Sequence, residues 1–304
     1  MVERTPILNV VTHVLLFLGF LMAVAPFAIV AIAASHNLQD VNEVPMPLIP
    51  GQDFWANVTR AWTEVDLGHK LLNSFIFASG VAIGKVFISA ITAFSIVYFR
   101  YPGRMLIFWL IFITLMLPLE VRIVPTYAVA ANVLSPYQAI LDVTGISWLI
   151  ETLSGIHVEL SFGLLNSYTG LILPLVATAT GTFLYRQFFL TIPDELTEAA
   201  RMDGAGALRF FVDVLLPLSR TNMAALATIM FLWAWNQYLW PLLVTTDPSH
   251  ATAVTELKEL IPNVGGIPEW NIAMAGTLIV MLPPLVVVVL MQRWFVRGLI
   301  ATEK

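Results

Sequence analysis

Long apolar segments are the feature that most constrains this chain. A helix needs about 20 apolar residues to cross a bilayer. Segments of that kind lie near residues 11–34, 71–98, 105–130, 169–190, 222–244 and 272–296. A soluble domain typically carries about a quarter charged residues, whereas charged residues make up only 12% of this chain. We therefore expect an all-α fold, a polytopic transmembrane helical bundle with six spans.

The first apolar segment has two interpretations. The small residues from Ala31 to Ser35 resemble the cleavage site of a signal peptide. A signal peptide has an apolar region of only about 7–15 residues, and this segment is longer and contains Pro26. We therefore expect a retained span, with residues 1–70 forming an N-terminal span and its extracytoplasmic loop.

The rest of the chain, residues 71–304, is expected to form a core domain with the other five spans. Two of its connections are long. Residues 133–162 are weakly apolar and are expected to be an extracytoplasmic insertion, folded as a surface helix or loop outside the bundle. Residues 191–220 connect the fourth span to the fifth.

Positive charges indicate the orientation of the spans, because arginine and lysine gather in cytoplasmic loops. With the N-terminus inside, the cytoplasmic side would hold Arg4, Arg100, Arg104, Arg186, Arg201, Arg209, Arg220, Arg293, Arg297 and Lys304. The opposite side would hold only Arg60, Lys70, Arg122 and Lys258. We therefore expect a multi-pass protein with both termini in the cytoplasm.

The sequence argues against an enzyme. It contains no cysteine, which excludes disulfides, thiolate metal sites and cysteine nucleophiles. It also lacks HExxH and GxSxG motifs and an aspartate pair within a span. The run from Gly80 to Lys85 is one residue short of a phosphate-binding loop and lacks its serine or threonine. Gly80 and Gly84 instead predict close helix packing. We expect no catalytic residue, metal or cofactor on this chain.

The connection 191–220 contains residues that are typical of the starts and ends of two short helices. Thr191 can cap the first helix, with Asp194 completing a capping box. Gly204 and Gly206 would end that helix, and Pro217 would end the second one. The first helix presents small residues edged by charges, a surface that another protein could approach closely. An ordinary solvated connector is the alternative.

One string in this connection identifies a family. Glu198-Ala-Ala-x-x-Asp203-Gly204-Ala205, with Leu216-Pro217 beyond it, resembles the EAA motif of binding-protein-dependent ABC import permeases. Three further strings resemble the MalG-type half of carbohydrate importers. They are Leu72-Asn73-Ser74-Phe75, Leu165-Asn166-Ser167-Tyr168 and Trp235-Asn236-Gln237-Tyr238. Pro118-Leu-Glu120-Val-Arg122-Ile, Arg186-Gln-Phe-Phe and Phe295-Val-Arg-Gly-Leu resemble the glycerol-3-phosphate permeases of that family. Residues 133–162 depart from the family pattern.

The resemblance implies a type I ABC importer permease in the bacterial inner membrane. The connection 191–220 would carry the coupling helix, which inserts into a groove of a cytoplasmic ATPase. The residues implied in this contact are Glu198, Ala199, Ala200, Arg201, Asp203, Gly204, Ala205 and Arg209. The implied partners are a second homologous permease, two ATPase subunits that use ATP and Mg, and an extracytoplasmic substrate-binding protein. Membrane lipid surrounds the chain, and no nucleic acid is involved.

Ionisable residues within spans are candidates for the substrate pathway, because they are costly in a bilayer. Lys85 lies within the second span, and Glu120 and Arg122 lie near the outer end of the third. The guanidinium of Arg122 would suit a phosphate. The alternatives are a structural or snorkelling Lys85, and an interfacial Arg122 bonded to a glutamate of another helix.

A group of aromatic and amide residues in the fifth span is a second candidate for the pathway. A path for a polyol, with amides bonding its hydroxyl groups, can be lined by Trp233, Trp235, Asn236, Gln237, Tyr238 and Trp240. They can equally serve as polar contacts between helices and as an interfacial aromatic belt.

The resemblance implies that this subunit forms half of a pathway for sn-glycerol-3-phosphate or glycerophosphodiesters. A neutral sugar or oligosaccharide is the alternative substrate. An ion-driven secondary transporter is a further alternative, since it would also need charges within its spans. Such a transporter has no reason to carry the EAA-like string.

Overall fold

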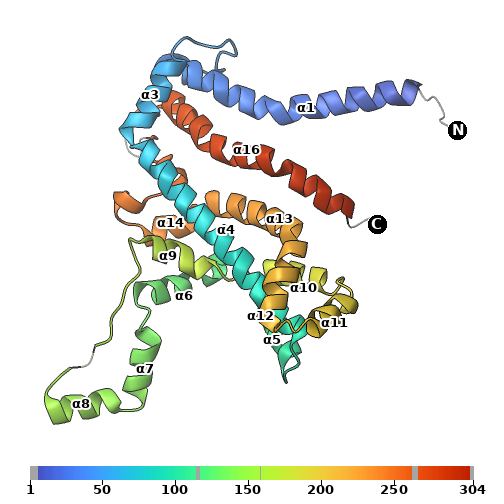
Figure 1. Ribbon diagram of the computed structural model, residues 1–304. Coiled ribbons are helices and arrows are strands. Elements are labelled where there is room, and N and C mark those ends of the chain that lie inside the picture. The colour runs from blue at the N-terminus through green and yellow to red at the C-terminus, as the bar shows by residue number, and fades with distance from the viewer. Residues whose placement is uncertain (1–5, 114–116, 158, 262–265, 302–304) are drawn as a thin grey trace. The chain divides into compact units, whose positions relative to one another are not determined.

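The computed structural model describes residues 6–113, 117–157, 159–261 and 266–301, with residues 293–301 described by their backbone alone. Helices are the only regular elements in these ranges, so the expected all-α fold is confirmed (Figure 1). Contacts between residues divide the chain into two compact units. The first comprises Met1–Leu71 and Thr255–Pro283, and the second comprises Leu72–Val254 and Pro284–Lys304.

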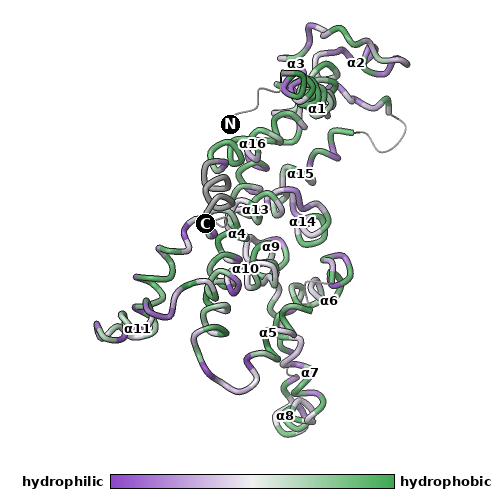
Figure 2. The backbone as a smooth tube through the Cα atoms, turned by 90° about the vertical axis from the view of Figure 1, so that its right-hand side faces the viewer, coloured by the Kyte–Doolittle hydropathy of each residue, from purple (hydrophilic) through white to green (hydrophobic). Residues whose placement is uncertain are grey.

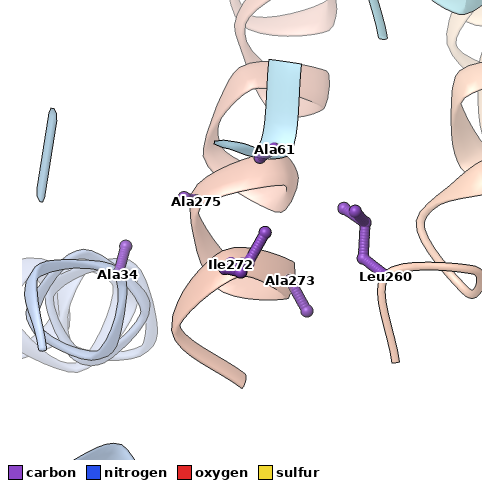
Figure 3. Close-up of a cluster of buried hydrophobic side chains, with 6 residues drawn as sticks. All are labelled: Ala34, Ala61, Leu260, Ile272, Ala273 and Ala275. Carbon is purple, nitrogen blue, oxygen red and sulfur yellow. The ribbon is translucent and has the colours of Figure 1, made fainter. Parts of the chain in front are cut away.

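The first unit is held together by a small apolar core. It contains α1 (Pro6–Ser35), α2 (Leu38–Val41), α3 (Phe54–Glu64) and the first part of α16 (Trp270–Ala301). Figure 3 shows the buried side chains of this core, which are Ala34, Ala61, Leu260, Ile272, Ala273 and Ala275. Most of these are alanines, which allow the helix backbones to approach each other closely.

Buried amides complete the packing of the first unit. The Asn57 side chain donates hydrogen bonds to the carbonyls of Ala34, at 2.9 Å, and His36, at 2.8 Å. Asn271 Nδ2 in turn donates to Asn57 Oδ1 at 2.9 Å. These bonds satisfy carbonyl groups at the end of α1, which a helix cannot satisfy internally.

The second unit holds most of the other helices. They are the greater part of α4 (Leu67–Tyr98), α5 (Arg104–Ile113), α6 (Leu119–Ala131), α7 (Ser135–Val143), α8 (Ile146–Ser154), α9 (Tyr168–Ile172), α10 (Ala179–Phe189), α11 (Asp194–Met202), α12 (Ala207–Phe210), α13 (Leu216–Trp235) and α14 (Leu239–Val244). The short helix α15 (Ala253–Glu256) lies where the two units meet in the sequence.

Four helical segments of the described chain are long and apolar enough to cross a membrane. They are Ile7–Ser35, Leu67–Tyr98, Ala207–Trp235 and Trp270–Gln292. A fifth span results if Tyr168–Leu175 and Ala179–Phe189, bent by 49° at their break, are taken together. The predicted third span, 105–130, corresponds to α5 and α6, which flank residues 114–116 outside the described ranges.

Close packing at two glycines confirms a prediction from the sequence. A Cβ atom at Gly80 would lie 2.5 Å from Ile172 Cδ1, and one at Gly84 would lie 2.5 Å from Val176 Cγ1. Helix α4 therefore lies directly against the break between α9 and α10. Pro174 precedes this break, and a proline removes a backbone donor that a continuous helix would use.

The end predicted for the second short helix is wrong. Helix α12 does not stop at Pro217 but continues through a π turn, Phe211–Leu215, into α13. Because Pro217 has no N–H group, it cannot form the regular bond to Asp213, and the wider turn before it accommodates this loss. The fifth predicted span is in turn interrupted, since α13 ends at Trp235 and α14 begins at Leu239.

The predicted capping box at the start of the first short helix is also wrong. Helix α11 begins at Asp194, after Pro193, and no side chain bonds its first N–H groups. The Thr191 hydroxyl instead donates to the Phe188 carbonyl at the end of the preceding helix, at 2.7 Å.

The segment 133–162 forms two short helices. Helices α7 and α8 are joined at Gly145, which has a φ of 72°, and neither helix has a buried residue. Large apolar side chains on both helices are exposed, Val143 and Leu153 among them.

Candidate functional site

The second unit encloses a cavity of about 710 Å³. Its wall comes from α4, α5, α6, the start of α10 and the end of α13. The charged residues in this wall are Lys85, Glu120 and Arg122, and the hydroxyl and amide groups are those of Thr92, Thr178, Thr180, Thr182 and Gln237. The three ionisable residues that were predicted from the sequence therefore line the same cavity.

Lys85 is held by an aromatic ring. Its side chain comes from α4 and is only 5% exposed. The Nζ atom lies 3.4 Å from the centre of the Trp233 ring, and Lys85 forms no ion pair among the described residues. The negative face of an indole attracts a cation, so Trp233 offsets part of the cost of burying the ammonium.

Arg122 and Glu120 lie in the first turns of α6. The Nε atom of Arg122 is buried and has no hydrogen-bond partner in the described part of the chain. The Glu120 side chain is exposed, and the described ranges contain no ion pair between the two residues. A glutamate of another helix bonded to Arg122, the alternative considered above, is likewise not found there.

Two helices begin at the wall of this cavity. Helix α6 starts after Pro118 and α10 starts after Thr178, and neither of these N-cap residues gives its helix a side-chain cap. Residues of both starts, including Leu119 and Ala179, line the cavity. The free N–H groups and the dipole at a helix N-terminus favour an anion. Together with Lys85 and Arg122, they make this cavity suitable for an anionic solute.

The aromatic and amide group predicted in the fifth span is only partly at the cavity. Trp233 lines it from α13, and Gln237 lines it from the break between α13 and α14. Trp235 is 2% exposed, and its ring packs against Phe231 at 5.6 Å. Asn236 is exposed and donates to the Leu232 carbonyl, and Tyr238 does not line the cavity.

Four threonines of the wall were not predicted from the sequence. They are Thr92, Thr178, Thr180 and Thr182. For the last three a signal was present, since three hydroxyl residues follow Pro174 closely in an otherwise apolar segment.

The connection between α10 and α13 contains the residues of the EAA-like string. Glu198, Ala199 and Arg201 are exposed on α11, whose residues are mostly polar in Figure 2. Asp203 ends this helix, and Gly204 follows with a φ of 72°. Arg209, on α12, is exposed and lies 3.3 Å from Asp213.

The opposite side of α11 faces a smaller pocket. Ala200 and Ala205 are half-buried and line a pocket of about 260 Å³ together with Tyr98 and Arg100 from the end of α4. Ala200 therefore packs toward the end of α4, and Arg201 also lines this pocket, whereas Glu198 and Ala199 are exposed.

Two exposed apolar residues extend the surface of this connection. Met202, at the end of α11, is 84% exposed, and Leu208, on α12, is 75% exposed. Neither was predicted from the sequence, because single exposed apolar residues are common on protein surfaces and give no signal of their own.

Comparison with known proteins defines the class of this chain. The family of the binding-protein-dependent transport system inner membrane component matches residues 85–301. The chain therefore belongs to this family of ABC transporter membrane subunits, as its EAA-like string indicated.

Individual relatives match over the whole length. The sn-glycerol-3-phosphate transport system permease protein UgpE of Yersinia pestis bv. Antiqua (strain Antiqua) is 47% identical over 310 residues, covering 100% of both chains. UgpE of Agrobacterium fabrum is 47% identical over 311 residues, and UgpE of Escherichia coli O1:K1 / APEC is 44% identical over 310, again with 100% of both chains covered.

A solved structure shares the fold. It is a bacterial ABC transporter involved in the import of the acidic polysaccharide alginate. The TM-score is 0.74 at 19% sequence identity, and the match covers 97% of this chain and 99% of that one.

Proposed function

We propose that this chain is one permease half of an ATP-driven importer for sn-glycerol-3-phosphate or glycerophosphodiesters. The observation that carries the proposal is the cavity lined by Lys85, Arg122 and two uncapped helix starts. The names of the full-length relatives support the same solute. A neutral sugar would not need two cations in the wall of the pathway.

The chemistry of the wall suits both parts of such a solute. The planar guanidinium of Arg122 can bind two phosphate oxygens at once, and Lys85 supplies a second positive charge. Thr178, Thr182 and Gln237 can bond the glycerol hydroxyl groups. The volume of about 710 Å³ lies in the usual range of solute sites and leaves room for the additional group of a diester.

The importer would contain the partners expected for this family. They are a second permease, two cytoplasmic ATPase subunits and an extracytoplasmic binding protein. In this arrangement the chain crosses the inner membrane six times, with both termini in the cytoplasm and with α5 and α6 contributing the third span. Solute would pass through the cavity by alternating access, as ATP binding shifts the population between inward-open and outward-open states.

Helix α11 would carry the coupling contact. Glu198, Arg201 and Asp203 would orient the ATPase, and the exposed Met202 and Leu208 would provide the apolar area that such a contact needs. The left-handed turn at Gly204 would set the angle between α11 and α12.

Uptake of radiolabelled glycerol-3-phosphate by cells tests the proposed cavity. Lys85→Gln and Arg122→Gln should each lower the uptake rate about tenfold or more, as expected when a charge-assisted hydrogen bond to the solute is lost. Lys258→Gln is the matched control, because this lysine is exposed and lies outside the cavity. Uptake at the normal rate in both cavity variants, at normal protein levels, would remove the cavity from the pathway.

A further inference from the structure

The sequence Leu-Asn-Ser-aromatic occurs twice in this chain, at residues 72–75 and 165–168. Neither copy lines the cavity described above. In the structure, the two asparagines bind the same stretch, residues 244–251, which begins at the last residue of α14. The two copies therefore act on one segment.

Asn166 binds this stretch mainly as an acceptor. Its Oδ1 atom accepts from the backbone N–H groups of Thr246, at 2.7 Å, and Asp247, at 2.9 Å. Its own N–H donates to the Val244 carbonyl at 3.0 Å. Asn166 has a φ of 55°, a conformation that asparagine and aspartate adopt more easily than most residues.

Asn73 binds the next part of the stretch as a donor. Its side chain is fully buried, and Nδ2 donates to the carbonyls of Ser249 and Ala251, each at 2.9 Å. The Tyr168 hydroxyl, from the second copy, donates to Asn73 Oδ1 at 2.6 Å. This bond connects the two copies directly.

The segment held in this way is the continuation of the cavity wall. Gln237 lies in the break that precedes α14. Within α14, the buried Trp240 donates from Nε1 to the Leu171 carbonyl at 3.0 Å. The helix after the break is thus fixed at Trp240 and again beyond its C-terminal end, and the position of the break depends on these attachments.

We propose that Asn73, Asn166 and Tyr168 are positioning residues for the cavity. They hold α14 and residues 244–251 so that the break at 236–238 keeps Gln237 in the wall. The inference rests on the proposed function only in taking this cavity as the solute pathway. Its structural content does not depend on which solute passes.

Aspartate substitutions distinguish the two asparagines. Asn166→Asp keeps an oxygen for the two N–H donors and tolerates the same backbone conformation. It loses the bond from Nδ2 to the Thr246 hydroxyl, but that hydroxyl also donates to Oδ1 and can donate to a carboxylate, so the attachment should be preserved. Asn73→Asp removes both N–H bonds and places a carboxylate against two carbonyl oxygens, of which the one of Ala251 is buried and would lose its donor.

The absence of cysteine from the sequence makes a direct test available in the assembled transporter. Gln237→Cys reports the position of the break, and Thr178→Cys, on another part of the cavity wall, is the matched control. The labelling rate of each cysteine by a water-soluble maleimide is measured alone and combined with Asn166→Ala, Asn166→Asp, Asn73→Asp or Tyr168→Phe.

We expect Asn166→Ala and Asn73→Asp to change the labelling rate at position 237 about fivefold or more, the effect of losing an ordinary hydrogen bond on a local equilibrium. Tyr168→Phe should change it less, Asn166→Asp should leave it unchanged, and the rate at position 178 should stay constant throughout. Equal rates at 237 in all variants would overturn the proposal, and so would equal changes at both positions. If Asn73→Asp prevents assembly of the transporter, the comparison of Asn166→Ala with Asn166→Asp still tests the proposal. If the transporter does not carry glycerol-3-phosphate, the proposed solute is refuted, but the attachment of residues 244–251 is not.

Discussion

The ammonium of Lys85 lies over the face of Trp233, 3.4 Å from the ring centre, at the wall of the cavity. This contact gives a buried lysine a defined direction without giving it a carboxylate partner. A carboxylate would neutralise the charge that an anionic solute needs, whereas an indole leaves that charge in place.

Removal of the Trp233 ring should therefore weaken transport. Trp233→Leu should lower glycerol-3-phosphate uptake by roughly 3- to 30-fold, the range expected when a cation–π contact of about 0.5–2 kcal/mol is lost. Trp233→Phe keeps an aromatic face and should fall between this variant and the wild type. The half-saturating solute concentration of purified, reconstituted transporter would measure the effect. Equal activity of Trp233→Leu and wild type would show that the contact has no part in transport.

The glycines of α4 should tolerate no larger residue. Gly80→Val and Gly84→Val would place new atoms against Ile172 and Val176, and overpacking of this kind costs about 1–3 kcal/mol. The melting temperature of the complex in detergent should fall for both variants. Gly19→Val is the control, because a Cβ there meets nothing within 4 Å. A similar melting temperature for all three variants would contradict the close packing of α4.

The turn after α11 should require glycine at one position and not at the other. Gly204 has a φ of 72°, whereas Gly206 has an ordinary extended conformation. A Cβ at either residue would meet nothing within 4 Å, so any difference arises from the backbone, where a positive φ costs an L-residue about 1–2 kcal/mol. Gly204→Val should lower the solute transported per ATP hydrolysed, and Gly206→Val should not. The reverse order would show that the turn does not set the coupling geometry.

Charge reversal on α11 should separate ATP hydrolysis from transport. Glu198→Lys should abolish uptake while the protein reaches the membrane at its normal level, because the side chain is exposed and forms no ion pair within the described part of the chain. Glu195→Lys, on the same helix but outside the EAA-like string, should have a smaller effect. Uptake and immunoblots of membranes measure both. Normal uptake by Glu198→Lys would refute the coupling role of α11.

The sequence located the apolar segments well, because hydropathy decides which parts of a chain leave water. It located helix ends less well. Pro217 suggested an end, but a π turn accommodated it and the helix continued to Trp235. The break at Asn236 had no such signal, since it depends on tertiary contacts of the following helix, such as that of Trp240 with Leu171.

The same limit applies to the candidate site. Lys85, Glu120 and Arg122 were found from charge alone, because a charged residue in an apolar segment is costly wherever it lies. Of the six aromatic and amide residues considered in the fifth span, only Trp233 and Gln237 line the cavity. Which side chain faces a cavity depends on the rotation of the helix and on where it breaks, and neither is encoded in residue type.

The most direct test of the account is the ATPase activity of the purified multi-subunit complex with its binding protein. Glycerol-3-phosphate, glycerophosphocholine and maltose are compared as stimulating solutes. The account predicts stimulation by the two phosphorylated compounds and none by maltose. Stimulation by maltose alone would keep the importer class but contradict the proposed solute and the role of Arg122 in binding it.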